Sequence, residues 1–108
     1  MNRIAVSRKA AAFATDIARR TRPAASEAPE WVRRVIDWGA GPRAGQSMLR
    51  TAKALAAMDG RPAIANEDIR EVALPVLRHR LGCNFRARAE GLDEDKVVEK
   101  IMAEVKEP

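Results

Sequence analysis

The segment Gly41-Pro42-Arg43-Ala44-Gly45-Gln46-Ser47 holds two glycines, a cation and a hydroxyl, which are the residue types of a phosphate-binding loop. Such a loop follows the pattern G-x-x-x-x-G-K-[ST] and comes directly after a strand. Here the glycines are too close together, and Gln46 stands where a lysine would neutralise phosphate. The segment therefore predicts no nucleotide cradle of its own.

Arg43 remains as the candidate functional residue. Gly41 can cap a helix, and Pro42 has the fixed φ that suits the first helical position. We therefore expect Arg43 on the first helical turn, beside unpaired backbone N–H groups and the positive end of the helix dipole. This placement presents a cation to an anionic ligand. Judged from position alone, however, an arginine at the start of a helix is more often an ordinary exposed surface residue than a ligand-binding one.

The other chemically reactive side chains are isolated. His79 lies between two arginines with no neighbour to orient it as a base, which indicates a surface or structural role. Cys83 is the only cysteine, so no disulfide forms within the chain, and we expect an inert core thiol. One histidine and one cysteine exclude a His/Cys zinc cluster. The cysteine usage predicts a reducing, cytoplasmic location, and no catalytic dyad is visible.

The charge of the chain is uneven. Residues 1–54 carry eleven basic and four acidic side chains, whereas residues 55–108 carry nine basic and eleven acidic ones, and 15 of the cations are arginine. The basic half favours an anionic partner, such as nucleic acid, an anionic membrane or a nucleotide phosphate. Compositional bias toward Arg and Ala is the equally weighted alternative. No apolar run approaches the roughly 20 residues of a membrane span.

The length and composition predict one helical domain over residues 1–108. Twenty-one alanines and no tyrosine favour helices over an extended sheet. The fold class that we predict is mainly α, with five helices and a minimal two-stranded β-ribbon. A transit peptide is the alternative interpretation of the Arg- and Ala-rich first 20 residues, whose period fits an ordinary helix better.

Capping residues and apolar periods set the expected elements. Ser7 should cap the first helix and Asp93 the last one. The apolar face of the first helix is Ala10, Phe13, Ala14, Ile17 and Ala18. Pro75 should kink or restart the fourth helix. The alternation of apolar residues from Leu81 to Ala87 predicts a strand, for which Ala63–Ala65 is the only visible partner. Two tryptophans flank the second helix as core or interface anchors, and Arg33 and Arg34 should form a solvated face. The expected ranges are helices over 7–21, 29–38, 42–59, 66–79 and 93–105, and a strand over 80–88.

Several segments together resemble the C-terminal lid domain of the MoxR family of AAA+ ATPases. The resemblance covers almost the whole chain, and it is most specific from Trp38 to Leu81. One departure is Gly41, where many members carry Ser before the Pro-Arg pair. The matching segments are Ala18–Arg22, Trp38–Ala44, Ala52–Ala56, Asp59–Arg61, Glu67–Ile69, Pro75–Leu81 and Asn84–Gly91.

The resemblance implies a specific role for Arg43. In that family the arginine of this element is the sensor 2 residue, which reaches from the lid to the γ-phosphate of ATP. Gly41 and Pro42 would shape the nucleotide contact, while the missing core domain would bind ATP with Mg²⁺. The Walker A and Walker B elements of such a core are absent here, so we expect the chain to be an excised part of a larger ATPase.

The resemblance also implies partners for the complete protein. It would be a homo-hexameric, ATP-driven chaperone that remodels client proteins or inserts cofactors into them. The lid would contact the AAA+ core of the same protein, and a partner with a von Willebrand factor A domain is common in the family.

Two other function classes remain open from the residues alone. The basic half and the helix order favour a small nucleic-acid-binding module, although the arginines are scattered instead of following one helix. A steep salt dependence of binding would identify that class. The third class is a protein interaction domain without a ligand.

We predict that the isolated chain folds but neither hydrolyses ATP nor binds it tightly, because it lacks a phosphate loop. Calorimetric titration with ATP checks this expectation. Saturable binding at micromolar concentration would contradict it.

Overall fold

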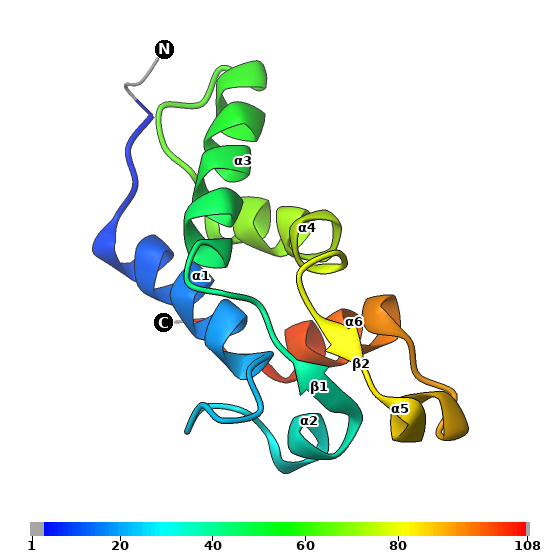
Figure 1. Cartoon of the computed structure of the whole chain (residues 1–108). Coiled ribbons are helices and arrows are strands. Elements are labelled where there is room, and N and C mark those ends of the chain that lie inside the picture. Colours follow the sequence, from blue (N-terminus) through cyan, green and yellow to red (C-terminus); the bar gives the residue numbers. More distant parts are fainter. Residues whose placement is uncertain (1–3, 108) are drawn as a thin grey trace.

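The computed structural model describes residues 4–107, which form an elongated helical domain of 44 × 23 × 21 Å. Helices α1, α3 and α4 pack on one another at one end, and α6 lies against α4 and α1 (Figure 1). The other end holds α2, α5 and a two-stranded antiparallel sheet (Figure 1). The elements are α1 Arg8–Arg20, α2 Glu30–Val35, β1 Ile36–Trp38, α3 Ala44–Met58, α4 Asn66–Leu77, β2 Gly82–Cys83, α5 Phe85–Ala89 and α6 Glu94–Glu104.

One hydrophobic core runs along the apolar faces of α1, α3, α4 and α6, and it continues to α2, β1 and α5 at the other end. The predicted stripe of α1 is buried as expected, and Phe13 and Ile17 are its largest members. Small alanines on α1 and α3 are fully buried, which allows the two helices to approach closely. No helix within residues 4–107 is both long enough and apolar enough to cross a bilayer.

Side-chain caps explain where α1 and α6 begin. The Ser7 hydroxyl accepts a hydrogen bond from the Ala10 amide at 3.0 Å, and the Asp93 carboxylate accepts one from Lys96 at 2.8 Å. Each satisfies one of the amides that the first helical turn leaves without a partner. Both caps were predicted from the sequence.

Helix α4 runs through Pro75 without a break and ends two residues later, at Leu77. The predicted restart at Pro75 is therefore wrong. Pro75 falls close to the C-terminal end of the helix, where only two further residues have to follow it, and Leu77 is fully buried.

The predicted strand over 80–88 is wrong for most of its length. Only Gly82 and Cys83 form β2, and Asn84 then caps the short helix α5, accepting a hydrogen bond from the Ala87 amide at 3.0 Å. The Asn84 amide and side chain both donate to backbone carbonyls of α2, which ends the strand ladder. Phe85, expected on a buried face, is 87% exposed.

The predicted partner of this strand is also wrong. β2 pairs with Ile36–Trp38, the segment expected to be the last turn of the second helix, so that helix already ends at Val35. The Trp38 indole lies directly over Gly82, where an added Cβ would be 2.3 Å from Nε1. Only glycine fits under this ring. Ala63 instead forms an isolated parallel bridge with Ala5.

The connection between α3 and α4 depends on a buried carboxylate. Asp68 is 5% exposed and accepts two hydrogen bonds from Arg61, at 2.6 and 2.7 Å, and one from the Ala65 amide at 2.7 Å. Arg61 also donates to the exposed Asp59 at 3.1 Å. The bonds from Arg61, with a smaller contribution from Ala65, lower the pKa of Asp68.

We predict that Asp68→Asn lowers the free energy of unfolding by about 2 kcal/mol at pH 7, because it removes a buried, charge-assisted interaction. Since the folded pKa lies below the unfolded value of about 4, this stabilisation is complete above that value. It is lost as the pH falls through the folded pKa. Urea unfolding from pH 7 to pH 2 should therefore show the two proteins converging in acid.

Asp59→Asn is the matched control, because Asp59 contacts the same arginine from an exposed position. It should change stability little at any pH. A difference between wild type and Asp68→Asn that stays constant into acid would contradict the assignment.

Candidate functional site

The predicted site residues lie together in the exposed connection from β1 to α3. Gly41, Pro42 and Arg43 are all exposed, and α3 begins at Ala44 instead of Pro42. The Gly41 carbonyl accepts a hydrogen bond from the Ala44 amide at 3.1 Å, so residues 41–44 form a turn and Arg43 takes the cap position. The expected Gly41 cap is therefore displaced by two residues.

Arg43 enters the helix in a near-helical conformation, with φ −85° and ψ −7°, and its carbonyl accepts from the Ser47 amide at 2.9 Å. The first turn of α3 contains no acidic side chain, and Arg43 has neither a hydrogen bond nor an ion pair with any residue of 4–107 through its guanidinium. Its charge is therefore available beside the positive end of the α3 dipole, where an anion is favoured.

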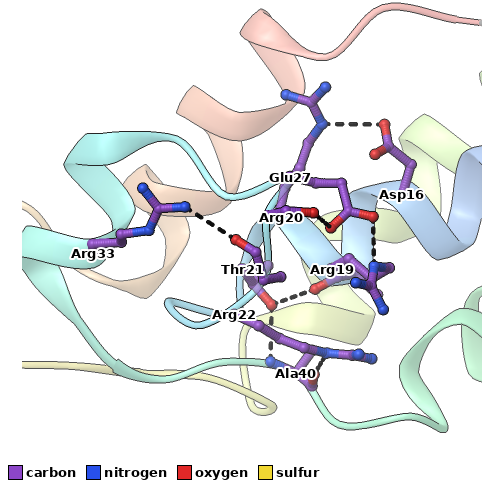
Figure 2. Close-up of polar contacts among 11 residues, drawn as sticks. Asp16, Arg19, Arg20, Thr21, Arg22, Glu27, Arg33 and Ala40 are labelled. Carbon is purple, nitrogen blue, oxygen red and sulfur yellow. Dashed lines mark hydrogen bonds and ion pairs between the residues drawn. The ribbon is translucent and has the colours of Figure 1, made fainter.

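The connection is held by a residue at the end of α1. Thr21 is fully buried; its hydroxyl donates to the Ala18 carbonyl at 2.6 Å and accepts from the Ala40 amide at 2.8 Å (Figure 2). The hydroxyl thus adds a second bond to the Ala18 carbonyl, which also accepts from the Thr21 amide at 3.2 Å, and it satisfies the only backbone donor of Ala40. That donor would be costly to leave buried without a partner.

Arg22 adds a second attachment. Its Nε donates to the Ala40 carbonyl at 2.6 Å, and its Nη2 donates to the Gly41 carbonyl at 3.1 Å. Figure 2 shows Thr21 and Arg22 both next to Ala40. The amide and the carbonyl of Ala40 and the carbonyl of Gly41, which immediately precede Pro42 and Arg43, are therefore all held by hydrogen bonds.

Gly39 makes this close approach possible. A Cβ at this position would lie 2.2 Å from the Thr21 carbonyl oxygen and 2.5 Å from its carbon, distances that no side chain allows. At Gly41, in contrast, a Cβ would meet nothing within 4 Å. The Ser that many family members carry at this position would therefore fit, and the departure noted from the sequence has no steric consequence.

Ion pairs and hydrogen bonds hold the end of α1 and the connection from α1 to α2. Arg19 pairs with Glu27 at 2.6 Å and Arg20 with Asp16 at 3.1 Å (Figure 2). The bond from Arg19 is the main reason that the pKa of Glu27 is lowered to about 2. Arg33 donates to the carbonyls of Pro23 and Ala25, at 3.1 and 3.2 Å. These contacts shape the segment that carries Thr21.

The expected solvated face is confirmed for Arg33, which is exposed, whereas Arg34 is half-buried. Besides the bonds of Arg33, Arg34 forms a two-bond ion pair with Glu90, at 2.9 and 3.2 Å, which joins α2 to the end of α5. Both arginines therefore have structural partners.

The other candidate residues lie apart from Arg43 in the sequence and have local explanations. Cys83 is half-buried, and burial, followed by the nearby Glu94 carboxylate, raises the pKa of its thiol to about 11, which keeps it protonated at neutral pH. Trp31 donates to Glu104 at 2.9 Å and lies 4.4 Å from the Lys100 ammonium. Residues 4–107 hold no cluster of His, Cys, Asp or Glu suited to a metal ion.

Sequence reasoning missed the attachment at Thr21 and Arg22. Thr21-Arg22-Pro23 reads as the end of a helix, and nothing in its local pattern shows that the helix end holds a segment 19 residues away. The one available signal is Gly39, because a glycine often marks a place where another backbone approaches closely.

Comparison with known proteins identifies a matching domain family and two similar proteins. A family described as the AAA lid domain matches residues 29–101. The chain is 33% identical over 73 residues to Chaperone MoxR1 of Mycobacterium tuberculosis, covering 68% of this chain and 19% of that protein. It is 42% identical over 48 residues to Protein MoxR of Paracoccus denitrificans, covering 44% of this chain and 14% of that protein.

A solved structure has the same fold. It is the 2.00 Å crystal structure of a Cytophaga hutchinsonii protein to which ATPase activity is ascribed, with a TM-score of 0.88 and 32% identity. The match covers 97% of this chain and 32% of that chain. The present chain thus spans a third or less of the length of each of these proteins.

We predict that Gly39→Ala lowers the free energy of unfolding by at least about 2 kcal/mol, because the methyl group collides with rigid backbone. Gly41→Ala is the matched control two residues away and should be nearly neutral. Thermal and urea unfolding of the two variants check the contrast. Equal stability of both variants would show that the connection does not approach Thr21 closely.

Proposed function

Because this chain belongs to the AAA lid domain family, we propose that it is the lid of a MoxR-like AAA+ ATPase and that Arg43 is its sensor 2 residue. The observation that carries the proposal is the geometry at the start of α3. Arg43 is exposed there, without a carboxylate partner within residues 4–107, at the end of a segment fixed by Thr21 and Arg22. ATP and Mg²⁺ would be bound by a core domain in the same polypeptide.

The attachment explains how a lid can transmit this contact. A hydrogen bond between Arg43 and the γ-phosphate exists only before hydrolysis, so it favours one lid position over another. Because Ala40 and Gly41 are bonded to the end of α1, a pull on Arg43 acts on α1 as well as on α3. The lid would then move as one body instead of yielding at the loop.

The complete protein would be a homo-hexameric chaperone in the cytoplasm that remodels client proteins or inserts cofactors into them. The similarity to Chaperone MoxR1 supports the chaperone part of this proposal. A partner with a von Willebrand factor A domain is part of the same expectation.

The placement of cations disfavours the nucleic-acid alternative. Binding a nucleic-acid backbone requires a continuous track of available positive charges. Many of the arginines instead bond to carboxylates within the fold: Arg19, Arg20, Arg34, Arg61, Arg70, Arg78 and Arg86.

We predict that Arg43→Ala, in the complete ATPase, lowers ATP turnover at least about tenfold, because it removes a preorganised charge at the γ-phosphate. The melting temperature of the lid should barely change, since the exposed Arg43 side chain makes no hydrogen bond or ion pair within residues 4–107. Steady-state ATPase kinetics and thermal melting provide the two readouts. Arg88→Ala, which removes an exposed arginine of α5, is the control and should retain turnover.

An equal loss of stability and turnover in Arg43→Ala would make Arg43 a structural residue. Full turnover in the same variant would reject its sensor role.

A further inference from the structure

A basic groove lies between α3 and the end of α4. It has a volume of about 520 Å³, and its walls include the cations Arg50 and Arg80, His79, and the hydroxyls of Ser47 and Thr51. No carboxylate among residues 4–107 lines it. The size falls within the range of roughly 300–1,000 Å³ for small-ligand sites. Guanidinium and hydroxyl donors together form a surface suited to an anion.

Arg80 is positioned over α3 by a specific bond. Its Nη2 donates to the Ser47 hydroxyl at 3.0 Å, and its backbone amide donates to the Leu77 carbonyl at 2.9 Å. The first contact ties the side chain to the second turn of α3, and the second fixes the backbone at the end of α4. Arg80 is nevertheless exposed.

Arg43 does not line the groove, but it lies on the same face of α3 as two of the residues that do. Arg43, Ser47 and Arg50 are at positions i, i+4 and i+7, which lie on one face of a helix. Side chains at i and i+4 have Cβ atoms about 5–6 Å apart, so the Arg80 guanidinium on Ser47 lies one turn from Arg43. Three arginines therefore share one surface at the start of α3.

These three arginines differ from most others in the chain. Within residues 4–107, Arg43, Arg50 and Arg80 form no ion pair, and neither do Arg8 and Arg88, whereas nine other arginines bond to aspartate, glutamate or backbone carbonyls. Keeping uncompensated like charges close together is unfavourable unless an anion joins them. The charge of this surface is thus available to an external ligand.

We propose that Arg80, held by Ser47, and Arg50 extend the Arg43 site into a polyphosphate-binding face, so that the lid contacts more than one phosphate group of a nucleotide. The proposal rests on the proposed function, since it takes the ligand of Arg43 to be the phosphate chain of ATP. It adds a second element to the nucleotide contact: the segment after α4 in addition to the start of α3. Arg80 is then a binding residue, and Ser47 is its positioning residue.

The test is an NMR titration of the 108-residue chain with inorganic tripolyphosphate at low ionic strength. Weak binding, in the millimolar range, should shift the amide signals of Ser47 and Arg80 and the Nε signals of the three arginines. Arg80→Gln should weaken this binding about fivefold, as expected for the loss of one exposed charge contact. Arg88→Gln, an equal loss of charge on α5, should leave it unchanged.

A second arm uses citrate, a trivalent carboxylate, at the same ionic strength. Tripolyphosphate binding that is tighter than citrate binding supports a phosphate site. Equal binding of both anions would overturn the phosphate assignment, as would an equal effect of Arg80→Gln and Arg88→Gln. Ser47→Ala should reproduce a part of the Arg80→Gln effect if Ser47 positions the guanidinium.

The two proposals fail separately. If Arg43→Ala lowers ATP turnover but tripolyphosphate does not shift Arg80, the sensor role stands and the extended face is rejected. If Arg80 responds to tripolyphosphate but Arg43→Ala retains turnover, the groove binds phosphate and the sensor role is rejected.

Discussion

The hydroxyl of Thr21 joins two segments that lie 19 residues apart and that meet nowhere in the local sequence pattern. It donates to the last turn of α1 and accepts from the Ala40 amide, in a position where water has no access. The direction in which Pro42 and Arg43 leave the fold depends on this bond. Gly39 and Arg22 contribute to the same arrangement. The absence of a side chain at Gly39 lets the segment approach α1, and the two bonds from Arg22 hold it there.

The distribution of charge indicates which kind of ligand the start of α3 can bind. Carboxylates neutralise arginines along α1, α2, α4 and the loops, where they stabilise connections such as Arg61 to Asp68. The start of α3 carries no acidic side chain in its first turn, and its arginine has no carboxylate partner within residues 4–107. A protein surface built in this way favours an anionic ligand over further contacts within the fold.

The helical part of the fold was predictable because its signals are local. The Ser7 and Asp93 caps and the stripe of α1 all follow from the period of a single helix. The strand over 80–88 was not, because alternating apolar residues are also compatible with a two-residue strand followed by a helix. Asn84 decides between these alternatives through bonds to α2, which is distant in the sequence.

In the candidate site, too, the locally encoded feature was predictable and the tertiary contacts were not. Arg43 was predicted by resemblance and by its place after Pro42, and the structure places it at the start of α3, which begins two residues later than expected. The residues that hold the site were not predicted, since Thr21 and Arg22 act through space on Ala40 and Gly41. Local sequence patterns report helix periods and caps well, but they do not report tertiary hydrogen bonds.

The most direct test of this account is native-state hydrogen exchange of the Ala40 amide. If Thr21 holds the segment as described, Ala40 should exchange with a free energy close to that of global unfolding, although it lies in a loop. Thr21→Val should remove that protection selectively while the core of α3 stays protected. Exchange of Ala40 as fast as that of an exposed loop amide in the unmodified protein would contradict the account.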